Sequence, residues 1–292
     1  MGSNHHYPEE GPSYLATVDG FAMDWAPVTN ARFAAFVRAT GYRTVAETTP
    51  DPRDYPGAAP DALRPGSVVF TPPSHQTDMR FWGDWWSFVP GACWRHPRGD
   101  ATGCKMDHPV VHVAYDDAGA YALWAGQQLP TEVEWEWAAG GAAGGTEFAW
   151  GDELTPGGIH MANIWQGRFP IENLLEDGHA GTSPVGAYPP NHRGLVDMIG
   201  NVWEWTADWW SARPKEYAAK PCCTPENLRE DAAARSLDPR QPGTRIPRKV
   251  IKGGSHLCAP NYCRRYRPSA RQPQAIDTGT SHIGFRCVSR DR

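Results

Sequence analysis

The sequence predicts an α+β fold built from short helices and strands that long, ordered loops connect. The 292 residues include 30 glycines and 28 prolines, spread along the chain, so regular elements are interrupted often. The 14 tryptophans argue against disorder, because disordered chains have few aromatic side chains to bury. The chain is long enough for one sizeable core, and we expect residues 1–292 to form a single domain.

Capping residues and apolar runs predict the individual elements. Three helices are expected: residues 30–39 after Thr29, a helix through Ala125 after Asp116, and residues 132–139 after Thr131, in a capping box with Glu134. Short apolar runs predict strands at 110–115, 195–199, 249–251 and 283–288. The proline-rich stretch 50–66 and the polar stretch 211–247 are expected to be surface loops.

Charge and cysteine content narrow the class of protein. The net charge is −5 and the pI is about 6.1, whereas a general nucleic-acid binder is basic. The sequence has no run of about 18 apolar residues, so no membrane span is expected. The N-terminal stretch MGSNHHYPEEGPS has no apolar signal segment, which predicts a cytoplasmic protein with reduced thiols. Seven cysteines cannot all pair within one chain.

Cys258 and Cys263 are the strongest candidates for chemistry. They lie in the loop sequence GGSHLCAPNYCRRYRPSAR (253–271), whose arginines favour the thiolate form. With His256 as the nearest imidazole and no carboxylate in the stretch, two thiolates suit a soft ion such as Cu(I) better than Zn(II) or Fe(II). A local disulfide, a zinc half-site, or two unrelated buried cysteines remain as alternatives.

A second candidate is Glu204, which stands between two tryptophans in GNVWEWTADWW (200–210). A buried carboxylate is costly unless it is paired or binds a metal. Together with Asn163 and Asp177, Glu204 offers hard oxygen ligands of the kind that Ca²⁺ prefers. Such residues also occur at ordinary turns and helix caps, so spacing alone leaves both interpretations open.

Several motifs, in chain order, resemble those of the formylglycine-generating enzymes, also called sulfatase-modifying factors. They are PVTNARFAAFV (27–37), ACWRHP (92–97), DHPVVHVAYDDAGAYALWAG (107–126), LPTEVEWEWAA (129–139), FAWGDE (148–153), ANIWQGRFP (162–170), GLVDMIGNVWEWTADWW (194–210), KGGSHLCAPNYCRRYRPSAR (252–271) and HIGFRC (282–287). The spacing of Cys258 and Cys263 is similar to that of the catalytic members. GGSHLCAP, with Cys222 and Cys223 nearby, resembles the actinobacterial branch.

The resemblance implies a loop-rich α+β domain related to C-type-lectin-like folds. It implies an enzyme that oxidises one cysteine of a C-x-P-x-R-type segment, in an unfolded or nascent sulfatase, to Cα-formylglycine. O₂ is the implied oxidant and Cu(I), held by Cys258 and Cys263, the implied cofactor. Trp203 and Ser255 match positions that flank the oxygen pocket. The positions implied at the substrate site are Tyr262, Arg265, Arg267 and His282. A monomer is expected.

The resemblance also implies two structural Ca²⁺ sites. The first is made by Asn163, Ile164, Asp177 and His179, and the second by Asp197, Gly200, Val202 and Glu204. In this scheme four residues contribute their backbone carbonyls and not side chains: Ile164, His179, Gly200 and Val202.

The chain departs from the animal branch in a few places. Four positions near the substrate groove or between the two cysteines differ: Ala259, Asn261, Gly279 and His282. Ala122 stands where animal enzymes have a cysteine that bridges to the equivalent of Cys287, so Cys287 is expected to be an unpaired, buried thiol. The chain starts at the MGS that normally follows a first strand, and we expect that strand to be missing.

Two other classes of function compete with the oxidase. A non-catalytic binding module of the same fold would be marked by loss of the cysteine pair. A metal-free thiol–disulfide oxidoreductase normally has C-x-x-C at a helix N-terminus. An iron-dependent sulfoxide synthase would need a histidine-rich helical domain, for which the 292 residues leave no room.

Overall fold

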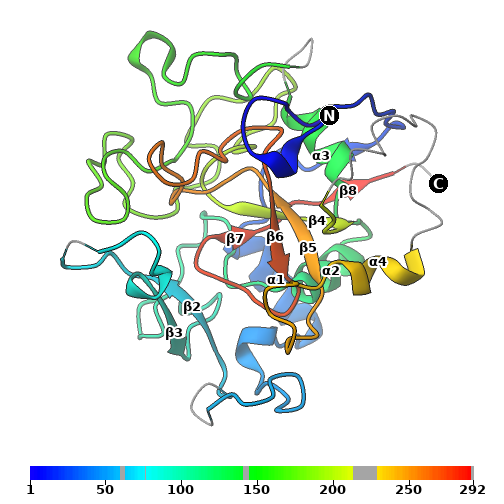
Figure 1. Ribbon diagram of the computed structural model, residues 1–292, viewed down its shortest axis with the longest axis vertical. Helices are drawn as coiled ribbons and strands as arrows, with labels where there is room; N and C mark the ends of the chain where they lie inside the picture. Colours follow the sequence, from blue (N-terminus) through cyan, green and yellow to red (C-terminus); the bar gives the residue numbers. More distant parts are fainter. Residues whose placement is uncertain (60–62, 76, 141–144, 213–228, 291–292) are drawn as a thin grey trace.

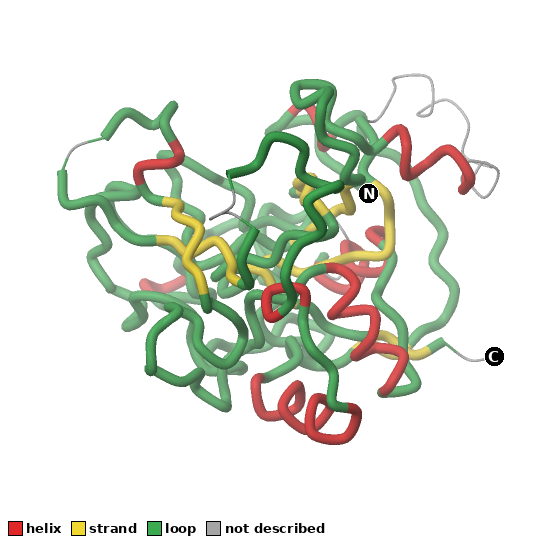
Figure 2. The backbone as a smooth tube through the Cα atoms, turned by 90° about the horizontal axis from the view of Figure 1, so that it is seen from below, coloured by secondary structure: helices red, strands yellow, loops and turns green. Residues whose placement is uncertain are grey.

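Figure 1 shows the computed structural model, which describes residues 1–59, 63–75, 77–140, 145–212 and 229–290. The helices are α1 (Asn30–Thr40), α2 (Tyr115–Trp124), α3 (Glu132–Ala139) and α4 (Arg229–Arg235). The strands are β1 (Ala22–Met23), β2 (Gly66–Phe70), β3 (Trp86–Pro90), β4 (Trp203–Trp209), β5 (Arg248–Lys252), β6 (Arg271–Ala275), β7 (Ile283–Gly284) and β8 (Val288–Ser289). Loops occupy most of the described chain (Figure 2), which confirms the predicted loop-rich α+β fold.

The strands form one four-stranded sheet, in the order β6-β5-β4-β7, and two smaller pairs, β1-β8 and β2-β3. In the larger sheet β4 runs antiparallel to β5, with Glu204 opposite Lys252, and parallel to β7, with Trp203 opposite Ile283. The start of β4, the end of β5 and the start of β7 therefore meet at one end of the sheet. The loop that follows Lys252 begins at this end.

The helix predictions are confirmed at α1 and α3 and need one correction. Thr29 Oγ1 accepts a hydrogen bond from the third residue of α1 at 3.3 Å, and Thr131 forms the expected capping box of α3. The predicted cap of α2, Asp116, is wrong. The Asp117 carboxylate accepts from the Ala114 N–H at 2.8 Å, so α2 begins two residues earlier than predicted and Asp116 lies in its first turn.

The strand predictions are wrong at 110–115 and 195–199. Both segments are buried, but their backbone groups bond to several separate parts of the chain and not to one neighbouring strand. His112 has φ 59° and Asp197 has φ 52°, a left-handed conformation that interrupts an extended strand. Both segments are therefore buried loops, and a buried loop has the same apolar residues in its sequence as a buried strand.

The prediction at 249–251 is confirmed as β5, and 283–288 divides into β7 and β8. The residues between β7 and β8 bond to the segment before α1 instead of continuing a ladder: the Phe285 carbonyl accepts from the Val28 N–H at 2.9 Å. Residues 60–62 of the predicted 50–66 loop lie outside the described residues, as do 213–228, which include Cys222 and Cys223. No described helix is long and apolar enough to span a membrane.

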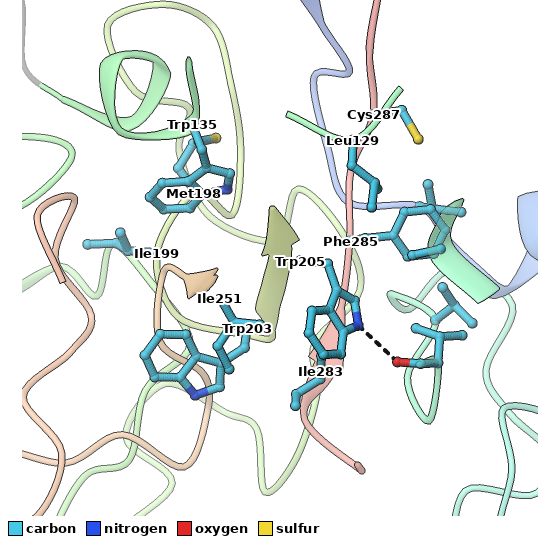
Figure 3. Close-up of a cluster of buried hydrophobic side chains, with 14 of the residues drawn as sticks. Leu129, Trp135, Met198, Ile199, Trp203, Trp205, Ile251, Ile283, Phe285 and Cys287 are labelled. Atoms are coloured by element: carbon cyan, nitrogen blue, oxygen red, sulfur yellow. Dashed lines mark hydrogen bonds between the residues drawn. The ribbon is translucent and has the colours of Figure 1, made fainter. Parts of the chain in front are cut away.

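The main core surrounds β4, and both faces of the first half of this strand are buried. Figure 3 shows Trp205 with its indole N–H directed at the Val113 carbonyl, at 3.0 Å. Trp135 of α3 lies beside Met198 on the other side of this view. The core is therefore filled by large aromatic side chains from helices, strands and loops, although few regular elements surround it.

Glu204 is neutralised inside this core by Arg286. Arg286 Nε and Nη2 donate to the two Glu204 oxygens at 2.7 and 2.8 Å, and Trp135 Nε1 donates at 2.8 Å. The Arg286 and Glu204 side chains are 0% and 1% exposed. The ion pair with Arg286 therefore offsets the cost of burying the Glu204 carboxylate between two tryptophans.

Replacing one member of this pair should be costly. Glu204→Gln leaves the Arg286 guanidinium buried without its counter-charge, and we expect the free energy of unfolding to fall by about 3 kcal/mol. Urea unfolding measures this. Asp51→Asn, which removes the partner of the exposed Arg53, is the control and should leave stability unchanged. Equal effects of the two substitutions would contradict this account of the core.

Candidate active site

The two cysteines lie on the loop that leaves β5. Gly253 and Gly254 have φ of 95° and 73°, and a Cβ on Gly254 would lie 2.9 Å from the Tyr266 nitrogen, so only glycine fits this turn. Beyond it, Cys258 N–H donates to the Ser255 carbonyl at 2.9 Å and Cys263 N–H donates to the Ala259 carbonyl at 2.9 Å. Two successive turns therefore bring the cysteine side chains to the same place.

The two sulfur atoms are 3.1 Å apart, too far for a disulfide at about 2.05 Å. Both side chains are buried, and both cysteines are free. The hydrogen bond from Cys258 and the nearby Arg265 guanidinium lower the pKa of Cys263 to about 7. Burial, and then the neighbouring Cys263, raise the pKa of Cys258. Of the two thiols, Cys263 is therefore the one that loses its proton more readily.

Ser255 lies in the turn that leads to Cys258, and Trp203 is the first residue of β4. Ser255 is fully buried, and its Oγ accepts from the Leu257 N–H at 3.2 Å within the turn before Cys258. Trp203 belongs to the same core cluster as both cysteines. Its backbone N–H donates to the His282 carbonyl at 2.8 Å, which joins the start of β4 to the segment before β7.

Aromatic rings form one side of the site. Tyr262 is 41% exposed, and its ring stacks on Phe169 with 4.4 Å between centroids and 8° between planes. Trp85 meets Tyr262 edge-on at 6.1 Å. The Asn261 side chain bonds the Phe169 backbone through both its oxygen and its nitrogen, at 3.4 and 3.3 Å. The turn between the cysteines is therefore held against a rigid aromatic wall.

The two arginines expected at the substrate site differ in burial. Arg265 is partly exposed, and its Nη1 lies 3.9 Å from Cys263 Sγ. Arg267 is 1% exposed and donates hydrogen bonds to Glu10 and to the Arg264 carbonyl. It therefore stabilises the cysteine loop from a buried position. The sequence did not reveal the acidic partners in the N-terminal segment, because nothing local in PEE (8–10) points to arginines more than 250 residues away.

His282 lies at the edge of the site, with its ring 4.8 Å from the ring of Trp86. Its Nδ1 forms a short hydrogen bond with Thr280 Oγ1. Burial lowers the pKa of His282, and neighbouring His256 and His112 add to the effect. Burial also lowers the pKa of His256 and of His112 to about 4. All three imidazoles are therefore neutral near pH 7, and none forms a ligand triad with the cysteines.

One residue of the first expected Ca²⁺ site, Asn163, has a buried acceptor without a partner. Asn163 Nδ2 donates to the Gly181 carbonyl at 2.8 Å, while the buried Asn163 Oδ1 accepts no hydrogen bond. The Asp177 carboxylate lies beside it, and its oxygens accept from the Ile164 N–H at 3.3 Å and the His179 N–H at 3.0 Å. A hard cation fits an orphaned amide oxygen next to a carboxylate.

The second expected Ca²⁺ site shares its carboxylate with Arg286. Three hydrogen bonds reach Glu204, and a carboxylate has about four lone-pair positions, so one remains for a cation. Burial raises the pKa of Asp197 to about 6, and Asp197 Oδ2 accepts from the Gly186 N–H at 2.7 Å. Within the described chain no three His, Cys, Asp or Glu side chains group as metal ligands, so any cation here also needs the carbonyls of Gly200 and Val202.

Comparison with known proteins decides the family. The model of the family described as "Sulfatase-modifying factor enzyme 1-like domain" matches residues 1–291. The chain belongs to the sulfatase-modifying factor family. It is 53% identical over 292 residues to the formylglycine-generating enzyme of Mycobacterium tuberculosis, covering 99% of this chain and 94% of that one. It is 47% identical over 290 residues to that of Streptomyces coelicolor, covering 97% and 83%.

Both relatives are actinobacterial, which agrees with the branch that the sequence predicts. Among solved structures, PvdO from Pseudomonas aeruginosa superposes with a TM-score of 0.62, covering 99% of this chain and 89% of that one. At 23% identity this likeness shows the sulfatase-modifying factor fold alone. Within that fold, the expected unpaired Cys287 is confirmed as a free, buried thiol.

The buried histidines predict acid sensitivity. An unfolded chain protonates histidine near pH 6.5, whereas folded His112 has a pKa of about 4. Its contribution to stability is therefore present above about pH 6.5 and is lost as the pH falls towards about 4. Asp117 and Asp197, whose pKa burial raises to about 6, act in the opposite direction. A substitution at His112 separates these effects.

His112→Gln can still bond Ser67 and the Pro97 carbonyl, the two partners of the imidazole, but it carries no titratable group. Between about pH 7 and about pH 5, urea unfolding should show this variant losing about 2 kcal/mol less stability than wild type. Identical losses in the two proteins would show that His112 is not held neutral by the fold.

Proposed function

We propose that this protein oxidises a cysteine in a C-x-P-x-R-type segment of a sulfatase polypeptide to Cα-formylglycine, with O₂ as the oxidant and Cu(I) as the cofactor. The observation that carries the proposal is the buried Cys258–Cys263 pair, with sulfurs 3.1 Å apart. The names of the relatives, 53% and 47% identical, support the product.

The donor set suits a soft monovalent ion. Cys258 and Cys263 offer two sulfurs, and the pKa of Cys263 is lowered to about 7. Thiolate ligands favour Cu(I). When bound, Cu(I) would supply the redox chemistry that activates O₂ at the pair. The two cysteines are themselves buried, as are Ser255 and Trp203, and burial of this kind excludes water from a reacting centre.

The reaction balances with an external thiol reductant. Loss of two hydrogens from the Cβ–S unit of the substrate cysteine gives a thioaldehyde, which water converts to the aldehyde and H₂S. O₂ becomes two molecules of water by accepting two electrons and two protons from the substrate, and two of each from the reductant. A thiol reductant becomes a disulfide in this step.

The exposed side of the pair is where a peptide would bind. Tyr262 presents a half-exposed ring that Phe169 holds flat, and the partly exposed Arg265 lies near Cys263 Sγ. His282 packs its ring against Trp86. Arg267 contributes by holding the loop, since Glu10 occupies its guanidinium. An extended, unfolded client suits this arrangement, because the target cysteine must reach sulfurs that are themselves buried.

A metal-free thiol–disulfide oxidoreductase is the second candidate, and the low pKa of Cys263 beside a second thiol favours it. The two cysteines lie on turns and not at a helix N-terminus, which disfavours it. Activity that a Cu(I) chelator does not affect would support this candidate. A non-catalytic module would bind a sulfatase peptide and leave its cysteine unchanged.

Cys258→Ser and Cys263→Ser should each reduce formylglycine formation below detection and remove most bound copper. A serine hydroxyl is hard and neutral, so it does not replace a thiolate on Cu(I). Mass spectrometry of a C-x-P-x-R peptide, incubated with enzyme, Cu(I), reductant and air, measures conversion of –CH₂SH to –CHO. Copper per chain is measured in parallel.

Cys287→Ser is the matched control, because this thiol is also buried and free but is not one of the two paired sulfurs; it should keep copper and turnover. The copper mechanism fails if wild type turns over at full rate in bathocuproine disulfonate, or if either pair variant binds Cu(I) as tightly as wild type.

We also propose that Ca²⁺ is structural, at the Asn163 and Glu204 sites. A ligand that binds only the folded state stabilises it by about 3 kcal/mol when present at about a hundredfold its Kd. A calcium-selective chelator should therefore lower the melting temperature, and elemental analysis should find two ions per chain, or one in Asn163→Ala. An unchanged melting curve with no calcium in wild type would refute this proposal.

A further inference from the structure

The N-terminal segment, residues 1–14, lies against the arginine-rich end of the cysteine loop, and we call it the N-terminal strap. Figure 1 shows the blue N-terminal end next to the orange loop that joins β5 to β6. The Arg264 N–H donates to Tyr7 Oη at 3.0 Å, and the Arg265 guanidinium lies 3.8 Å from the centre of the Tyr7 ring. Residues 257 positions apart are thus in direct contact beside the site.

Two adjacent carboxylates of the strap have different partners. Glu10 is 0% exposed and holds Arg267 with both of its oxygens, an anchor buried in the fold. Glu9 is 22% exposed, and its Oε1 accepts from Arg265 Nη2 at 2.7 Å. The anchor at Glu10 therefore presents Glu9 to Arg265, which faces the sulfur pair.

The Arg265 guanidinium is held on two sides and faces the site on a third. Glu9 takes Nη2, the Tyr7 ring covers one face, and Nη1 is directed at Cys263 Sγ, 3.9 Å away. Its Nε is buried without a hydrogen-bond partner. A long, partly exposed arginine tends to extend into water, so the position beside Cys263 depends on the groups that hold it.

We infer that Glu9 is a positioning residue that keeps Arg265 beside Cys263, so that the N-terminal strap completes the active centre. The inference rests on the proposed function in one respect, since it assigns Arg265 to the sulfurs that would hold Cu(I). The contact itself is independent of that assignment. Without Glu9, the guanidinium moves towards solvent, and Cys263 Sγ loses the positive charge that lies 3.9 Å away.

The test is a double-mutant cycle of Glu9→Gln and Arg265→Ala, with Cu(I) affinity measured by chelator competition in the absence of peptide. Residues that act through one contact are not additive. Glu9→Gln should weaken Cu(I) binding by about tenfold in wild type and by less than about twofold in Arg265→Ala. The kcat/KM for the peptide should fall in parallel, while the melting temperature stays near that of wild type.

Glu147→Gln is the matched control. Glu147 bonds His6 of the strap and Arg264, at 2.8 and 2.9 Å, but not Arg265, so Cu(I) affinity and turnover should be unchanged. A tenfold loss in Glu147→Gln would mean that any weakening of the strap has this effect, and would overturn the specific role of Glu9. A Glu9→Gln effect that persists in full without Arg265 would overturn it as well.

Failure of the proposed function gives a different result. If wild type binds Cu(I) but leaves the peptide unchanged, the oxidase proposal fails, and the affinity cycle still tests Glu9. If wild type binds no Cu(I), crystal structures of wild type and Glu9→Gln decide the matter. Displacement of Arg265 from Cys263 in the variant supports the positioning role, and an unmoved guanidinium refutes it.

Discussion

One guanidinium joins the segments on which the site is built. Arg286, just after β7, donates to the Glu204 carboxylate on β4 and to the carbonyls of Val196 and Asp197, at 2.9 and 3.1 Å. In a fold with so little regular structure, buried carbonyls lack ladder partners and need other donors. A buried ion pair adds little net stability by itself, but losing one member is costly. Arg286 therefore acts as a cross-link between loops.

The cysteine loop depends on the segment that Arg286 holds. Gly200 N–H donates to the Gly253 carbonyl, and His256 N–H donates to the Asn201 carbonyl, both at 3.0 Å. Asn201 has φ 53°, a conformation that persists only where its surroundings determine it. The order from the core outwards is thus Arg286, the 196–201 segment, the Gly253 turn and the sulfur pair. Each step fixes the next through backbone bonds, which allows two short turns to carry a site.

The sequence predicted what is local and missed what is distant. Helices α1 and α3 have their caps within a few residues, so local sequence was sufficient to predict them. The two cysteines are brought together by turns inside one stretch, but their spacing alone left a disulfide, a zinc half-site and unrelated buried thiols open. The partner of Glu204 is 82 residues away and that of Arg265 is 256 residues away. A carboxylate in a sequence does not indicate which arginine it will meet, and a buried loop such as 110–115 is as apolar as a strand.

The charges around the sulfurs bear on which ion the site would hold on the proposed function. The buried arginines 267 and 286 each have a carboxylate of their own, so they add no net charge. Arg265 is shared between Glu9 and Cys263 Sγ, so the group carries one net negative charge when Cys263 is ionised and Cys258 is protonated. On the proposed function, Cu(I) held by both sulfurs would take the place of the Cys258 proton, one positive charge for another. The surrounding ion pairs then keep their balance, whereas a divalent ion would change the charge of a buried site, at a cost in solvation that only further ligands could offset.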